Sequence, residues 1–394
     1  IIITIIVVVL TTLLTGCTGK EPNEIAYVVA LGIDSTDDDN YKITIQYANT
    51  TQISGGASES GGKAGSEIVD NVTIEAPNIY AGVGLANNIV SKSFSMSHAK
   101  LIVFSKEIAE KGVKDMIETL VRSEEIRPDV FIAVANTTAN DYLTSVNPEM
   151  EVNPAQYYQL IYQKNQLVGI PDGQLREFFT GLYTDNYDSI LPVAGVIEGS
   201  GGNSQNDDKG QSKDSQNEGS EGSSESLDSF ESKSSNEKDE NEKEKDAEKN
   251  TSKYEYDIKN YVGGETAIEK KNKAEAIGAA VFEKDKMVGE LGEVETEICK
   301  MLKGDYTYSY LTYYNNDTPD IPITVKTTQQ KKPKYKIDTD KKTVDIELYI
   351  ESDLYSLPAD YNVENKIEDF ERDVANYTSS ACTEFINNFT KKYN

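Results

Sequence analysis

The stretch KLIVFSKEIAEKGVKDMIETLVRSEEIRPDVFIAVA, residues 100–135, decides the fold of this chain. It begins with the apolar run Lys100–Phe104 and ends with the apolar run Val130–Ala135, both short enough to be strands buried on both faces. Between them, apolar residues recur at the spacing of an amphipathic helix: Ile108, Val113, Met116, Ile117, Leu120 and Val121. A strand, a helix and a second strand in this order predict a crossover unit with two parallel strands.

The residues before this unit predict a β-hairpin. Tyr41–Tyr47 alternates apolar and polar residues, which is typical of a strand with one buried face. The apolar run Ile25–Ile33 precedes it, and Asp34–Asn40 forms an acidic turn between the two. Ser54–Gly65 is rich in glycine and serine and predicts a loop, whereas Ala76–Val90 predicts a helix.

The residues after the unit predict further helices and a second hairpin. Tyr157–Tyr183 reads as a helix broken at Gly169-Ile170-Pro171. Ala276–Phe282 and Lys286–Leu291 predict paired strands, and Glu293–Lys303 predicts a short helix.

The C-terminal part predicts a strand pair covered by a helix. Val344, Ile346, Leu348 and Ile350 alternate with polar residues, and Lys334–Asp338 is the expected partner strand. A long amphipathic helix follows from apolar residues that step by three and four: Ile367, Phe370, Val374, Tyr377, Ala381, Phe385 and Phe389. We expect this helix to cover the apolar face of the sheet.

These patterns place the chain in the α+β class, with mixed sheets, packed helices and several domains. A chain of 394 residues is too long for one ordinary core. Residues 199–253 are nearly all polar and predict a disordered acidic insert. The expected segments are a signal peptide (1–16), a lipidated tether (17–24), an N-terminal α/β domain (25–198), the insert (199–253), a middle domain (254–320) and a C-terminal α+β domain (321–394).

Charge narrows the choice of partners. The net charge of −28 argues against nucleic acid, because a phosphate-binding protein needs clustered lysine and arginine. The same charge predicts repulsion from anionic lipid headgroups. Attachment to a membrane must therefore be hydrophobic.

The first residues resemble the leader of a bacterial lipoprotein. Ile1–Leu10 is an apolar run that suits the core of a signal peptide and is shorter than the ~20 residues that span a bilayer. Leu14-Thr15-Gly16-Cys17 follows, an apolar residue and two small residues before a cysteine. We expect cleavage before Cys17, with diacylglycerol on its sulfur and an acyl chain such as palmitate on its amino group.

Two other readings of the leader stay open. The chain begins without methionine or basic residues, so we expect its N-terminus to be truncated, and a transmembrane anchor remains an alternative if the preceding residues are apolar. A cysteine that follows a signal peptide by chance is the second alternative.

No constellation for catalysis or metal binding stands out. His98 is the single histidine, so an HExxH zinc helix and a histidine-based metal cage are ruled out. Gly56–Ala64 has the wrong spacing for a phosphate loop, and Asp34–Asn40 lacks the glycine and closing glutamate of a calcium loop. Cys299 and Cys382 lie on separate predicted helices, where two buried thiols are favoured over a disulfide. We expect no enzymatic activity, no cofactor and no metal.

Several segments in order resemble the Ger(x)C family of spore germination lipoproteins. They are EIAYVVALGID (24–34), HAKLIVF (98–104), IAEKGV (108–113), LVRSEEIRP (120–128), LPVA (191–194) and GAAVFEKDKMVGEL (278–291). The last is the most specific. The chain departs from the family pattern in its long insert, in a more polar helix after residue 291, and in ending at Asn394, before the family's usual last strand.

The resemblance implies the C subunit of a nutrient germinant receptor. Such a protein would be tethered through Cys17 to the extracytoplasmic face of a membrane, in the outer leaflet of the spore inner membrane or cell membrane. It would act in receptor assembly or signalling beside the integral membrane A and B subunits. The resemblance implies no catalytic residue. In its R-x-x-E-x-R turn, Arg122 and Arg127 could pair with Glu124, Glu125 or nearby carbonyls, or could face a partner subunit.

Two other functions compete with this interpretation. A solute-binding lipoprotein of an importer would need two lobes around a cleft with convergent polar groups. A lipid-anchored hydrolase is the third class.

Overall fold

The computed structural model describes residues 2–3, 24–38, 40–48, 69–148, 151, 153–163, 169–197, 260–266, 273–313, 322–357 and 366–393. Cys17, the predicted loop at 54–65 and the predicted insert at 199–253 lie outside these residues. The described residues form a mixed α+β structure, as the sequence predicts. None of their helices combines the length and apolarity needed to cross a membrane.

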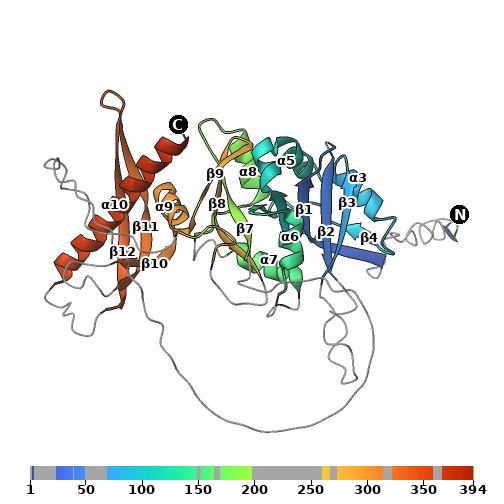
Figure 1. Cartoon of the computed structure of the whole chain (residues 1–394), viewed down its shortest axis with the longest axis horizontal. Helices are drawn as coiled ribbons and strands as arrows, with labels where there is room; N and C mark the ends of the chain where they lie inside the picture. Colours follow the sequence, from blue (N-terminus) through green and yellow to red (C-terminus); the bar gives the residue numbers. More distant parts are fainter. Residues whose placement is uncertain are drawn as a thin grey trace, which may run out of the picture. The chain divides into compact units, whose positions relative to one another are not determined.

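The first sheet of the described part has the order β3-β2-β1-β5-β6-β7-β8-β9, with β4 beside β1 (Figure 1). Its strands are β1 (Ile25–Ser35), β2 (Tyr41–Ala48), β3 (Val69–Ala76), β4 (Ser93–Ser95), β5 (Leu101–Ser105), β6 (Phe131–Ala135), β7 (Ile190–Val196), β8 (Ala274–Glu283) and β9 (Lys286–Leu291). The central strands β1, β5, β6 and β7 run parallel, and the outer pairs of the path run antiparallel.

The predicted crossover unit is confirmed at the centre of this sheet. β5 and β6 pair in parallel, with Leu101 opposite Phe131, and every residue of both strands is buried. The single predicted helix is divided into α4 (Lys106–Lys111) and α5 (Lys114–Val121). Gly112 ends α4 with φ of 120°, a left-handed conformation that glycine adopts without steric cost.

The predicted hairpin of β1 and β2 is also confirmed, with Ile33 opposite Ile43. The helix predicted over 76–90 is shorter, because the helical residues are α3 (Ile79–Ala86). The side chain of Asn78 caps α3 by accepting the N–H of Ala81 at 2.9 Å. β3, which pairs with β2, was not predicted.

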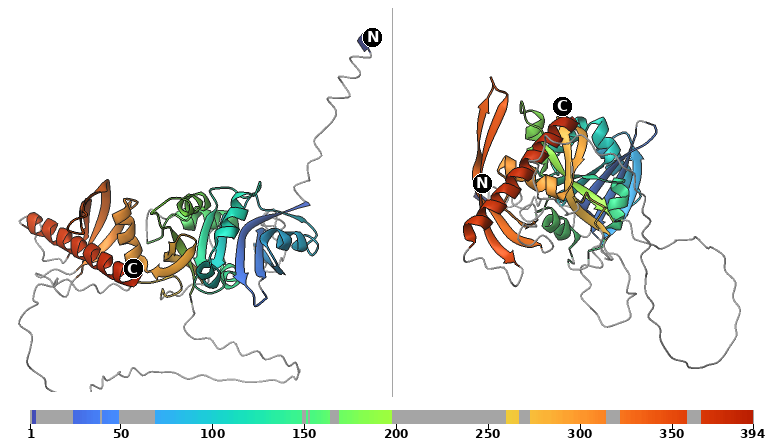
Figure 2. Two further views of the ribbon diagram at one scale, coloured as in Figure 1. Left: turned by 90° about the horizontal axis from the view of Figure 1, so that it is seen from above. Right: turned by 60° about the vertical axis from the view of Figure 1, so that its left-hand side comes forward.

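Helices cover both faces of the first sheet (Figure 2). α3, α4, α5 and α8 (Leu175–Leu182) supply residues to one apolar core, and α6 (Ala139–Ser145) and α7 (Pro154–Gln163) supply the other. α7 and α8 match the predicted helix with its break. The first sheet is therefore the middle layer of a three-layer arrangement.

The strands of the predicted middle domain extend the first sheet. β8 and β9 form the predicted hairpin, and β8 pairs with β7, so that Val196 lies opposite Ala274. The N–H of Ile197 donates to the carbonyl of Lys273 at 2.8 Å. One sheet therefore contains strands from both sides of residues 199–253, while the predicted domain boundaries themselves stay a prediction.

The second sheet has the order β10-β11-β12 and carries the predicted C-terminal helix. Its elements are β10 (Tyr308–Tyr313), β11 (Ile323–Asp338), β12 (Thr343–Ser356) and α10 (Ile367–Tyr393). α10 buries Phe370, Val374 and Tyr377 in a core shared with β10 and β11. The predicted short helix is α9 (Glu293–Lys303), which contacts β8, β11 and α10 and so lies between the two sheets.

Candidate functional site

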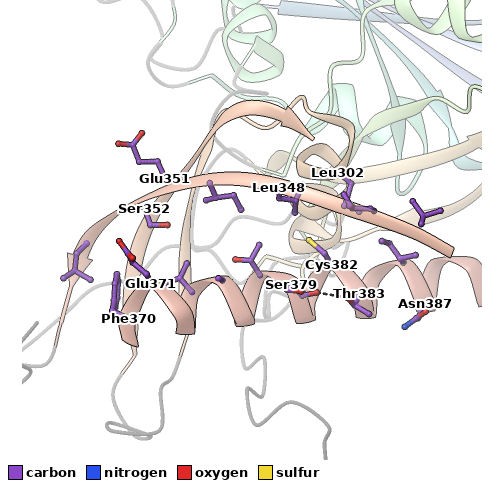
Figure 3. A pocket seen from close by; sticks show the side chains of 18 of the residues that line it. Leu302, Leu348, Glu351, Ser352, Phe370, Glu371, Ser379, Cys382, Thr383 and Asn387 are labelled. Atoms are coloured by element: carbon purple, nitrogen blue, oxygen red, sulfur yellow. Dashed lines mark hydrogen bonds between the residues drawn. The ribbon is translucent and has the colours of Figure 1, made fainter. Parts of the chain in front are cut away.

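A groove of about 940 Å³ lies between β12 and α10 (Figure 3). Its apolar lining comes mainly from these two elements: Val344, Ile346, Leu348, Ile350 and Leu354 of β12, and Ile367, Phe370, Val374 and Ile386 of α10. The alternating pattern of β12 places its apolar residues on the groove side, as the sequence predicts.

The groove exists because α10 covers only part of the second sheet. Val374 packs in the core, whereas Val344 and Ile367 remain 54% and 52% exposed. Within the described residues β12 pairs only with β11, so β12 is an edge strand. An apolar face beside an edge strand can bury a further apolar segment and can offer it main-chain hydrogen bonds.

The groove does not offer a catalytic arrangement. Among its lining residues only Glu351 and Glu371 are charged. Cys382 is the only nucleophilic sulfur, and burial raises the pKa of its thiol to about 11, so it is protonated at neutral pH. Nearby, the Thr383 hydroxyl donates to the carbonyl of Ser379 at 2.8 Å. These groups favour a surface that binds an apolar segment over a site that catalyses a reaction.

A second, polar cleft of about 320 Å³ lies where α8 and β7 approach α9. Its charged lining residues are Asp172, Glu177, Lys300, Lys303 and Asp305. The three acids and two lysines leave the lining with an excess of one negative charge.

Two of these side chains are held in unusual environments. Lys300 is 6% exposed and its Nζ donates to the carbonyl of Ile170 at 3.1 Å, while burial lowers the pKa of its ammonium. Asp172 has one buried carboxylate oxygen, Oδ1, without a hydrogen-bond partner among the described residues, and burial raises the pKa of its carboxyl. The cleft therefore offers a hydrogen-bond acceptor to a small ligand that carries a hydrogen-bond donor.

Glu297 is a half-buried carboxyl on α9. Its Oε1 accepts a hydrogen bond from the Ser309 hydroxyl at 2.6 Å. Burial raises its pKa to about 7, although that hydrogen bond and the nearby charge of Lys300 act in the opposite direction. α9 therefore carries a group that titrates near neutral pH, between the two sheets.

The structure gives most of the sequence-predicted site residues structural roles. His98 is exposed, with its Nδ1 3.0 Å from the Ser97 hydroxyl. Asp34 is buried and accepts the N–H groups of Ala139 and Asn140 at 2.7 and 3.0 Å, so it caps α6 rather than facing water in a solvated turn. Among the described residues no cluster of histidine, cysteine, aspartate or glutamate could hold a metal ion.

The two arginines of the predicted turn pair with acids other than those expected. Arg122 pairs with Glu118 on α5, and Nε of Arg127 lies 3.0 Å from a carboxylate oxygen of Asp129. Cys299 and Cys382 are free thiols, as the sequence favours, but Cys382 is buried whereas Cys299 is half-buried. Cys17, the predicted lipidation site, lies outside the described residues.

Sequence reasoning did not find the groove or the polar cleft. The alternation of β12 and the periodicity of α10 predict two apolar faces but not how far one covers the other. Lys300, within an otherwise apolar turn of α9, is the one local signal of the cleft. Asp172 carries no such signal beyond its place next to the predicted break at 169–171.

Comparison with known families defines the class of protein. Residues 19–196 match the family described as spore germination protein N-terminal domain, and residues 277–394 match the family described as spore germination B3/GerAC like, C-terminal. The chain therefore belongs to the Ger(x)C family of spore germination proteins, which confirms the resemblance seen in the sequence. This is a family of germinant receptor subunits and not a known family of enzymes.

Individual relatives carry names from the same family. The chain is 28% identical over 162 residues to spore germination protein KC of Bacillus subtilis (strain 168), a match that covers 38% of this chain and 40% of that protein. It is 26% identical over 148 residues to spore germination protein B3 of the same organism, covering 35% and 36% of the two chains. The crystal structure of the GerBC protein aligns with 90% of this chain and 80% of its own, with 15% identity and a TM-score of 0.43.

Proposed function

We propose that this protein is a lipid-anchored subunit of a nutrient germinant receptor that acts in receptor assembly or signalling during spore germination. The observation that carries the proposal is the presence of both family domains, in order, along one chain. It is supported by the sequence Leu14-Thr15-Gly16-Cys17 behind an apolar run, which has the form of a lipoprotein leader.

In this proposal Cys17 carries the lipid, and the folded part lies on the extracytoplasmic side, in contact with the outer leaflet of the spore inner membrane or cell membrane. Its partners are the integral membrane A and B subunits of the receptor. The net charge of −28 supports a lipid anchor, because electrostatic attachment to an anionic surface is unfavourable. Two or three acyl chains give stable anchoring where one chain is marginal.

The test replaces the acylated sulfur in the native host. We expect Cys17→Ala to move the protein from the membrane fraction to the soluble fraction and to slow germination in response to nutrients. Cys299→Ala is the matched control, because it removes a free thiol from α9 and should leave fractionation unchanged. Membrane association that persists unchanged in Cys17→Ala would contradict the anchor.

A solute-binding lipoprotein of an importer is the second candidate function. The polar cleft beside Lys300 favours it, because Asp172 presents a buried acceptor oxygen without a partner among the described residues. Calorimetric titration of the purified chain with mixed amino acids tests this candidate. Saturable heat that is absent in Asp172→Asn would support it, and no heat in either protein would exclude amino acids as the solute.

A further inference from the structure

One long segment of this acidic chain contains no aspartate or glutamate. The chain has 67 aspartate and glutamate residues in 394, yet residues 76–106 contain none and include Lys92, Lys100 and Lys106. In the structure this segment forms α3, β4 and β5. β5 is buried in the centre of the first sheet. The exposed part of this segment therefore belongs to α3, to β4 and to the turn between them.

The turn after α3 exposes two large aliphatic side chains. Leu85 is 49% exposed and Ile89 is 67% exposed. The N–H of Ile89 donates to the carbonyl of Ala86 at 3.0 Å, so the chain continues to turn beyond the last residue of α3. Leu85 in the last turn of α3 and Ile89 in the turn that follows are therefore two exposed aliphatic side chains at the end of this helix.

This pair lies close to the point where the chain enters the fold. β4 pairs in parallel with the start of β1, with Ser93 opposite Ile25. The N–H of Phe94 donates to the side-chain oxygen of Asn87 at 2.7 Å, which ties the end of α3 to β4. Ser93 lies four positions after Ile89, so Ile89 lies within ~20 Å of Ile25.

The predicted lipid is within reach of the same surface. Ile25 lies eight positions after Cys17, and an extended chain of eight residues spans at most ~29 Å. The tether is thus long enough for Ile89 to touch the bilayer that holds the lipid. Several acids lie near this end of the sheet: Glu24 directly before β1, Asp70 near the Tyr47 ring, and Glu124 and Glu125, which line a shallow hollow beside Tyr80 of α3. The carboxylate of Glu125 accepts the N–H of Met96 at 2.6 Å.

We infer that the surface formed by Leu85, Ile89 and Lys92, the lipid-facing surface, contacts the bilayer and sets the orientation of the protein on it. The inference rests on the proposed lipid anchor at Cys17. Because the chain as a whole is repelled by anionic headgroups, the contact that we infer depends on aliphatic side chains beside the tether and not on charge. Exposed aliphatic side chains gain free energy when they enter the boundary between headgroups and acyl chains.

The absence of tryptophan from the chain allows a clean test. Ile89→Trp places a single indole in the lipid-facing surface, and Ile337→Trp places one at a position 69% exposed near the end of β11. The full lipidated chain is reconstituted into vesicles of phosphatidylethanolamine and phosphatidylglycerol, with a lipid brominated in its acyl chains as quencher. We expect quenching and a blue shift of the emission for I89W and neither for I337W.

The outcomes separate this inference from the proposed function. Flotation of the reconstituted vesicles is measured first, and failure of the protein to float overturns the anchor and, with it, the lipid-facing surface. Flotation without quenching of I89W overturns the lipid-facing surface alone, as does equal quenching of I89W and I337W. Leu85→Trp is a second reporter, which we expect to be quenched as well and which guards against local disturbance in the first variant.

Discussion

Replacing Glu297, the half-buried acid of α9, should change how the stability of this protein depends on pH. Glu297 has a pKa of about 7 in the folded protein, raised mainly by burial, against an ordinary value of 4.5. The folded state therefore binds this proton more tightly than the unfolded state. Its contribution to stability is complete below about pH 4.5 and is lost as the pH rises through about 7.

The size of the effect follows from the two pKa values. Their difference of about 2.5, at 1.36 kcal/mol per pKa unit, corresponds to ~3 kcal/mol of unfolding free energy lost between about pH 4.5 and 8. Glu297→Gln cannot ionise, and its amide oxygen can still accept the hydrogen bond of Ser309. We expect the variant to match the parent protein within ~1 kcal/mol at about pH 5, and to exceed it by up to ~3 kcal/mol at about pH 8.

The assay is urea unfolding followed by circular dichroism at several pH values, with the parent protein and its variants in parallel. The difference between parent and variant isolates Glu297 from other titrating groups such as Glu293, whose pKa burial also raises. Glu110→Gln, at an exposed position on α4, is the control and should follow the parent at every pH. Parallel stability curves for the parent and Glu297→Gln would refute the reasoning.

Three further predictions concern packing and backbone geometry, each measured by urea unfolding. Asp34→Ala removes the acceptor for two N–H groups at the start of α6, and we expect a loss of ~1–2 kcal/mol, so an unchanged midpoint would contradict the cap. Val374→Ala, on the side of α10 that packs into the core, should cost ~2 kcal/mol, whereas Val344→Ala, at an exposed position of β12, should cost under ~0.5 kcal/mol; equal losses would mean that the Val344 side chain is covered as well. Gly112→Ala should cost more than ~1 kcal/mol, because its φ of 120° disfavours other residues, and a neutral result would argue against that backbone conformation.

Local patterns in the sequence predicted the strands at the centre of the fold. The runs at Lys100–Phe104 and Val130–Ala135 became β5 and β6, because a strand buried on both faces is apolar along its whole length. β3 was missed since its sequence VDNVTIEA mixes polar residues into an outer strand, with burial at its two ends. The place of β8 beside β7 depends on pairing between residues far apart in the chain, which periodicity does not report.

The candidate functional sites also differ in whether local sequence patterns can predict them. The lipidation of Cys17 depends only on a short motif, so it can be proposed from the sequence alone. The groove depends on how far α10 covers β12, and the cleft depends on Asp172 meeting Lys300, more than 100 residues later. Contacts between residues so far apart in the sequence depend on tertiary packing, so only the structure shows them.

The hydrogen bond between Ile197 and Lys273 has a consequence for engineering and for evolution. Because the chain leaves the first sheet and rejoins it at neighbouring positions, material added between those positions need not alter the pairing of β7 with β8. Each doubling of a flexible connection costs only ~0.6 kcal/mol of closure entropy. A fluorescent protein with adjacent ends, inserted in place of part of residues 199–253, would make a reporter for tracking this protein in living spores.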